Sequence, residues 1–184
     1  MARRGPSRRL VVDACVVQSA GAEDATSPVS RNCRDVLKAI YDICHRVVLT
    51  PDLDGEWRRH MSGFARKWRR WMKSKRKVEP LEDPTDDRLR REVEHAAPSR
   101  AKARAMLKDM HLVEAALAAD NVVVSSETNA RRLFAAASSY IPRLANVMWV
   151  DPSEDPEGVL DWLRGGARQR RSLTLDASRT ADAE

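Results

Sequence analysis

The chain has 184 residues, 42% of them hydrophobic, and its 33 Lys and Arg against 27 Asp and Glu give a formal net charge of +6. This length and apolar content suit one domain with one core, and no apolar run approaches the length that spans a membrane. The three cysteines form no Cys-x-x-Cys pair, which argues against a zinc site or a disulfide framework and predicts reduced thiols in the cytoplasm.

The first half of the chain predicts two parallel strands joined by a helix. Residues 1–9 are basic and are expected to be flexible, and the short β-branched run at 10–12 indicates a buried strand. The small and polar residues at 18–30 predict a loop. From 30 to 44 the apolar residues share one helical face, so a helix there would return the chain to a second strand at 47–49.

The middle of the chain predicts a basic helical insertion over residues 57–98. Large apolar residues recur there at three- and four-residue steps, which is typical of one amphipathic helix. They are Trp57, Met61, Phe64, Trp68, Trp71 and Met72. No Asp or Glu occurs in 57–77, so a polyanion is the expected partner. The residues predicted to bind RNA phosphates are Arg58, Arg59, Arg66, Lys67, Arg69 and Arg70.

Both faces of this predicted helix also have a plainer explanation. An aromatic stripe at this spacing is more typical of a core or an interface than of a base-stacking surface. A basic face is usually solvated, although the absence of acidic residues favours phosphate contact here. We expect the aromatic face to be buried in the domain or in a homodimer, and the basic face to line the route to the acidic residues described below.

The second half of the chain again alternates helices with strands. An apolar face indicates a helix that begins after Ser99, and it is followed by a strand at 122–124 and a short helix at 129–137. A fourth strand is expected at 147–150, with a last helix after Asp155. This alternation predicts an α/β fold, a three-layer α/β/α sandwich around a central, mostly parallel sheet of four to five strands.

The pattern also predicts the limits of the domain. One domain is expected over residues 10–164, with the basic insertion at 57–98 inside it. Beyond this point the chain becomes polar and loses its periodicity, so residues 165–184 are expected to be a disordered tail or a segment ordered by a partner.

Four acidic residues fall where the predicted elements would bring them to one edge of the sheet: Asp13, Glu56, Asp109 and Glu127. Asp13 and Glu127 follow buried strands, and ligands of open α/β sheets collect at the carboxyl ends of the strands. Carboxylates gathered there would raise one another's pKa unless a cation neutralised them, which predicts bound Mg²⁺ or Mn²⁺. Taken alone, a single Asp at a strand end is better explained as a cap or turn residue.

These residues resemble a PIN-domain ribonuclease, of the kind found as the toxin of VapBC toxin–antitoxin pairs. The resemblance covers residues 10–150, and its most specific block runs from Asp109 to Glu127. It implies that Asp13, Glu56 and Asp109 ligand the metal and that Glu127 fills the fourth position of the catalytic acids. The family generally has Asp in that place, so Glu127 keeps the charge on a side chain longer by one methylene.

The resemblance implies a metal-dependent endoribonuclease that uses Mg²⁺ or Mn²⁺ to hydrolyse RNA phosphodiester bonds in the cytoplasm. RNA is the implied substrate, an antitoxin protein and a second copy of the chain are candidate partners, and no membrane contact is expected. The alternative function is a PIN-fold RNA-binding or assembly module with weak or no catalysis. Phosphate-ester chemistry on a small substrate is disfavoured, because no second Asp stands two residues after Asp13 and no Gly-rich loop follows.

Other polar residues near these acids have structural explanations. Glu114 and Asp120 are expected to be solvated helix residues, and His111 a packed or surface histidine. The polar residues at 125–129 are expected to cap a helix, with hydrogen bonding to a phosphate as their functional alternative.

Overall fold

A five-stranded sheet organises the part of the chain that the computed structural model describes, residues 7–177. All four neighbouring strand pairs are parallel, and the strand order is β3-β2-β1-β4-β5. The strands are β1 (Arg9–Val12), β2 (Arg46–Leu49), β3 (Val78–Pro80), β4 (Val122–Val124) and β5 (Met148–Val150). The predicted three-layer α/β/α sandwich is confirmed.

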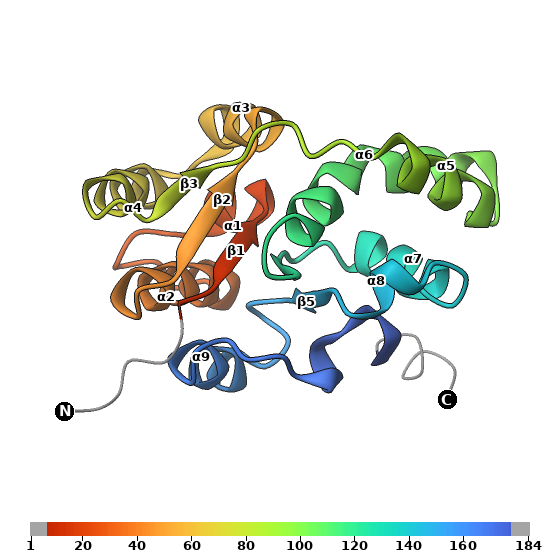
Figure 1. Cartoon of the computed structure of the whole chain (residues 1–184). Coiled ribbons are helices and arrows are strands. Elements are labelled where there is room, and N and C mark those ends of the chain that lie inside the picture. The colour runs from red at the N-terminus through yellow and green to blue at the C-terminus, as the bar shows by residue number, and fades with distance from the viewer. Residues whose placement is uncertain (1–6, 178–184) are drawn as a thin grey trace.

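The helices pack as two groups, which form the outer layers. The first group contains α1 (Ala14–Ser19), α2 (Pro28–Asp42), α3 (Pro51–His60), α4 (Gly63–Ser74) and α9 (Pro156–Arg164). The second contains α5 (Asp87–Ala96), α6 (Arg100–Leu117), α7 (Thr128–Ala137) and α8 (Pro142–Ala145). Figure 1 shows α5 to α8 gathered away from α2, α3, α4 and α9.

The direction of the chain along the sheet reverses between β1 and β4. The chain moves from β1 to β2 and β3 in one direction, then returns to β4 and β5 on the other side of β1. Because such crossovers are right-handed, this reversal sends the connections after β1 and β4 to opposite faces, and the carboxyl ends of these two strands are where open α/β sheets commonly bind ligands. Val12 pairs with Val124 there, so both strands end at the same level.

The core forms around the β-branched strands predicted from the sequence. The side chains of β4 and of 10–12 in β1 are fully buried, as are the indoles of Trp57 and Trp68. Each indole N–H is also satisfied, since Trp57 Nε1 donates to the Val12 carbonyl oxygen at 2.9 Å and Trp68 Nε1 to that of Leu37 at 2.6 Å. The aromatic stripe is therefore mainly core, as its spacing indicated, although Trp71 is 44% exposed.

The expected single helix through this stripe is wrong, because it divides into α3 and α4. Helix α3 ends at His60, and Met61 leaves the helical conformation with φ −54° and ψ 134°. Ser62 then caps α4 by accepting a hydrogen bond from the Ala65 N–H at 3.1 Å. The Ser62-Gly63 pair, one a strong N-cap and the other a poor helix interior residue, explains the break.

Two further elements were not predicted. Helix α1 occupies Ala14–Ser19, directly after the first strand and partly within the expected loop, and α2 already begins at Pro28. Strand β3 covers only Val78–Pro80 and lies at the edge of the sheet. A three-residue edge strand that ends in proline carries almost no sequence signal, because proline is depleted in strands.

The carboxyl-terminal segment is not a disordered tail as far as residue 177. After α9 the chain forms a short 3₁₀ helix, η1 (Arg171–Leu173), and Thr174 makes an antiparallel bridge with Met148. Leu175 is fully buried, and its N–H donates to the Val147 carbonyl oxygen at 2.9 Å. Leu173 and Leu175, two apolar residues in an otherwise polar segment, pack against the core. The expectations for residues 1–6 and 178–184 lie outside the described residues.

None of the helices within residues 7–177 combines the length and the apolar character needed to cross a lipid bilayer.

Candidate functional site

Asp13 directly follows β1, beside the carboxyl end of β4. Its backbone N–H continues the ladder by donating to the Val124 carbonyl oxygen at 3.0 Å, and the residue is only 6% exposed. The Ser125 hydroxyl donates to Asp13 Oδ2 at 2.6 Å, and the Cys15 thiol donates to the same oxygen at 3.1 Å. Both donors are neutral, so they fix the orientation of the carboxylate without supplying a positive charge.

Asp109 lies on α6, which packs on both β1 and β4. Burial raises the pKa of Asp109, and the carboxylates of Asp13 and Glu127 raise it further, while Lys108 and His111 lower it. Asp13 and Glu127 therefore lie within electrostatic range of Asp109. Three of the four predicted acids thus lie in the same region of the structure.

Glu127 is connected to Asp13 by a backbone hydrogen bond through Ser125. Its N–H donates to Ser125 Oγ at 3.1 Å, so a hydrogen-bonded path runs from Glu127 through Ser125 to Asp13. Glu127 occupies the N-cap position of α7, but its side chain makes no capping hydrogen bond. Ser125 stands two residues before the N-cap of α7, so its Oγ accepts from the N-cap N–H of Glu127 and not from an N–H of the first helical turn.

Glu56 lies beside His111. Its Oε2 lies 3.3 Å from His111 Nε2, which connects α3 to α6 two residues after Asp109. His111 Nδ1 lies 3.1 Å from the Lys108 carbonyl oxygen, an acceptor, so Nδ1 is the ring nitrogen that carries hydrogen. His111 Nε2 is buried and has no hydrogen-bond partner among residues 7–177, so it lies at ion-pair distance from Glu56 without a hydrogen bond between them. Sequence analysis predicted a packed or surface His111 and missed this pairing.

The side chains of the site suit a hard cation, but they do not form a ready coordination sphere. No three or more His, Cys, Asp or Glu side chains within residues 7–177 are close enough together to hold one metal ion. Asp13 and Glu56 are each turned toward protein partners, Ser125 and His111. Carboxylate oxygens are nevertheless the ligands that Mg²⁺ and Mn²⁺ prefer, and a cation would relieve the repulsion felt by Asp109. Convergence on one cation therefore stays a prediction.

The predicted RNA-binding residues divide into two sets in the structure. The exposed set contains Arg58, Arg59, Arg66, Lys67 and Arg70. The side chain of Arg69 is only 12% exposed and forms an ion pair with Asp54. Arg58 pairs with the same carboxylate at 2.6 Å. Asp54 precedes the acid-free segment by three residues and was not recognised as the partner of its arginines.

Two other carboxylates hold the fold together, which corrects the expectation that both are solvated. Glu114 is 3% exposed and receives Arg90 Nε at 2.8 Å and Nη2 at 2.7 Å. Asp120 accepts from the Arg9 N–H at 2.8 Å and from its guanidinium at 3.2 Å. Helix α5 packs across α6 and buries Glu114, a tertiary contact that helical periodicity could not show.

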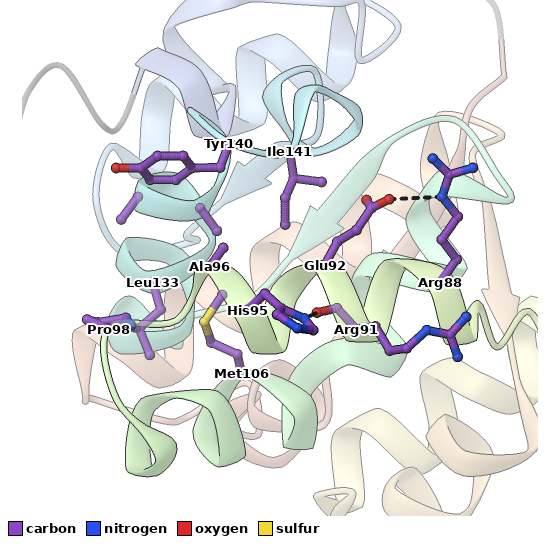
Figure 2. A pocket seen from close by; sticks show the side chains of 12 residues that line it. Arg88, Arg91, Glu92, His95, Ala96, Pro98, Met106, Leu133, Tyr140 and Ile141 are labelled. Atoms are coloured by element: carbon purple, nitrogen blue, oxygen red, sulfur yellow. Dashed lines mark hydrogen bonds and ion pairs between the residues drawn. The ribbon is translucent and has the colours of Figure 1, made fainter.

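A large cavity lies elsewhere. It has a volume of about 940 Å³ and lies between α5, α6, α7 and the turn before α8. Figure 2 shows His95 and Arg91 on one wall and Leu133, Tyr140 and Ile141 on the other, with Met106 between them. None of the four predicted acids lines it, so size alone does not identify the chemistry of this protein.

Comparison of the chain with protein-family models, with curated proteins and with solved structures finds no match. The PIN-domain resemblance therefore rests on the residues quoted above and stays a prediction.

Proposed function

We propose that the chain is a metal-dependent endoribonuclease that hydrolyses RNA phosphodiester bonds with Mg²⁺ or Mn²⁺. One observation carries the proposal: Asp13 and Glu127 follow β1 and β4 where the sheet reverses direction and are joined through Ser125, and Asp109 lies within electrostatic range of both. Ligands bind at this position in open α/β sheets. Glu56 is adjacent through His111, and it completes the set of acids that the sequence indicated.

Each residue has a distinct role in this proposal. Asp13, Glu56 and Asp109 hold the cation, and Glu127 acts on it directly or through water. Ser125 and Cys15 position Asp13, since their hydrogen bonds fix one carboxylate oxygen and leave the other available. When bound, the cation supplies a Lewis acid that neutralises the growing phosphate charge and lowers the pKa of water. No serine or histidine nucleophile is required.

The basic surface of α3 and α4 supports RNA as the substrate. Exposed arginine and lysine side chains on these helices can neutralise backbone phosphates whatever the base sequence. A cytoplasmic toxin held inactive by an antitoxin protein is one setting for such an enzyme. A second copy of the chain is a further candidate partner, and the exposed ring of Trp71 beside Phe64 is a surface on which it could dock.

A second candidate function is an RNA-binding or assembly module with weak or no catalysis. The observation that favours it is the engagement of Asp13 and Glu56 by other side chains, with no group of three ligands assembled among the described residues. The two candidate functions differ in whether they require a bound metal ion. An enzyme must bind Mg²⁺ or Mn²⁺ through Asp13, whereas the module has no such need.

The test is an RNA cleavage assay with and without Mg²⁺ or Mn²⁺, comparing the wild type with Asp109→Asn. We expect metal-dependent cleavage that falls by about a hundredfold or more in the variant, because a charged ligand of the cation is lost. Asp42→Asn is the matched control, since Asp42 is an exposed carboxylate at the end of α2. RNA binding of equal strength in both variants, with no cleavage by the wild type at any metal concentration, would establish the second candidate instead.

A further inference from the structure

A second cavity opens at the edge of the sheet, between α3, α4 and β3. It has a volume of about 620 Å³, within the range of small-ligand sites, and it lies at the carboxyl ends of β2 and β3. Its apolar lining comes from Leu49, Pro51, Val78, Pro80 and Leu81. Its basic lining comes from Arg58, Arg69, Lys73 and Arg76. The region of Asp13, Asp109 and Glu127 does not offer this combination of apolar and basic side chains.

The charges in this cavity are not balanced. Asp54 is shared by Arg58 and Arg69, and Glu82 is the other acidic residue of the lining. Lys73 and Arg76 form no ion pair with any residue in the range 7–177 that the structure describes. Arg69 Nε is buried and has no hydrogen-bond partner there. The side chains of Lys73 and Arg76 are thus available to an anion.

Arg76 has an unusual backbone conformation for a residue with a side chain. The Lys77 N–H donates to the Met72 carbonyl oxygen and the Arg76 N–H to that of Lys73, each at 2.9 Å. This pair of hydrogen bonds is the Schellman motif, and it places Arg76 in the left-handed position with φ 55°. Glycine is the usual residue there, because a Cβ is unfavourable in this conformation. An arginine at this position carries a conformational cost and directs a cation to the cavity.

We infer that this cavity binds one nucleotide. Lys73 and Arg76 hold its phosphate, and the base and sugar pack on the apolar surface of Val78 and Leu81. The nucleotide has two sources: a free mononucleotide, or one residue of an RNA strand that also reaches Asp13 and Asp109. The second source rests on the proposed function, whereas the first does not.

The experiment measures equilibrium binding of adenosine 5′-monophosphate, inorganic phosphate and a short single-stranded RNA to the full chain. The double variant Lys73→Ala/Arg76→Gly is compared with the control Lys38→Ala/Lys75→Ala, which removes the same charge from exposed lysines that do not line the cavity. All proteins used with RNA carry Asp109→Asn, so that the strand stays intact. We expect nucleotide or RNA affinity to fall about tenfold or more in the first variant, and to change less than twofold in the control.

Folding is monitored separately with Arg76→Gly alone. This change relieves the left-handed arginine, so the melting temperature should stay the same or rise while affinity falls. Mononucleotide binding that depends on Lys73 and Arg76 assigns the cavity to a free nucleotide, and dependence seen only with RNA assigns it to the strand.

Three results would overturn the inference. They are affinity for inorganic phosphate equal to that for the nucleotide, an equal loss in the Lys38→Ala/Lys75→Ala control, and binding unchanged in the Lys73→Ala/Arg76→Gly variant. Absence of RNA cleavage by the wild type would count against the proposed nuclease and leave these binding measurements unaffected.

Discussion

Two buried carboxylates in this protein, those of Glu114 and Asp13, have opposite kinds of hydrogen-bond partner. Glu114 receives two charged hydrogen bonds from the Arg90 guanidinium, at 2.8 and 2.7 Å. Asp13 receives only the neutral hydroxyl of Ser125 and a thiol, and no ion pair joins it to an Arg, Lys or His of the described residues. The difference shows which carboxylate the fold pairs with a cationic side chain and which it does not.

Asp13 also has acidic neighbours. Asp109 and Glu127 add negative charge beside Asp13, and the pKa of Asp109 is raised as a consequence of burial and of these carboxylates. A charge buried without a partner is unfavourable, and folds usually supply a cation when the role is structural, as at Glu114. This contrast supports the assignment of function to the Asp13 region and of stability to the Glu114 region.

The largest expected effect is on stability at the paired carboxylate. Glu114→Ala should lower the free energy of unfolding by about 3 kcal/mol, because it leaves the Arg90 guanidinium and the Asp86 N–H without their acceptor. We place the effect at the lower end for buried pairs since the Arg90 side chain is 34% exposed. Urea denaturation measures it, with Glu94→Ala on the exposed side of α5 as the control. A loss no larger than that of the control would end the structural assignment.

The next largest effect is stabilisation by a bound cation, which we expect to depend on Asp13. Mn²⁺ at a hundred times its dissociation constant should stabilise the wild type by about 2.7 kcal/mol if it binds the folded chain alone. Asp13→Asn should remove this stabilisation, and Glu114→Ala should retain it. Melting curves recorded over a Mn²⁺ titration give the measurement. Equal stabilisation of the wild type and Asp13→Asn would show that the cation binds elsewhere.

A smaller effect is expected from the neutral donor to Asp13. Ser125→Ala should lower the free energy of unfolding by about 1–2 kcal/mol, because a 2.6 Å hydrogen bond to a carboxylate and the acceptor for the Glu127 N–H are both lost. Ser139→Ala, which removes an exposed hydroxyl bonded to the Ala136 carbonyl oxygen, is the control. Chemical denaturation at neutral pH provides the comparison, and no difference between the two variants would refute a positioning role.

The smallest effect has the opposite sign. Asp109→Asn should raise the free energy of unfolding at pH 7 by less than about 1 kcal/mol, given that the side chain is partly solvated. A raised carboxyl pKa means that the folded protein binds the proton more readily than the unfolded chain, so the charged form lowers stability at neutral pH. The gain should vanish as the pH falls toward the ordinary value of 3.8. Melting temperatures of both proteins from pH 7 to acid test this sign.

Much of the sheet could be predicted because local sequence carries its signal. The β-branched run at Val122–Val124 is a strand with the predicted bounds, since uninterrupted apolar residues of this kind suit a parallel strand covered on both faces. The short edge strand β3 was missed, because its pairing with β2 rather than its own residues makes it a strand. The Ser62-Gly63 pair did contain the signal for the break between α3 and α4, and the apolar periodicity obscured it.

The sequence by itself determined that acids stand at strand ends and that a basic, aromatic segment lies between them, because strand position and helical periodicity are local properties. Only the tertiary structure decided which charges are paired. Asp13 and Ser125 are separated by 112 positions along the chain, and Arg90 and Glu114 by 24. Whether a carboxylate meets a guanidinium, a hydroxyl or another carboxylate depends on which helices cross the sheet beside it, and residue order alone does not specify that packing.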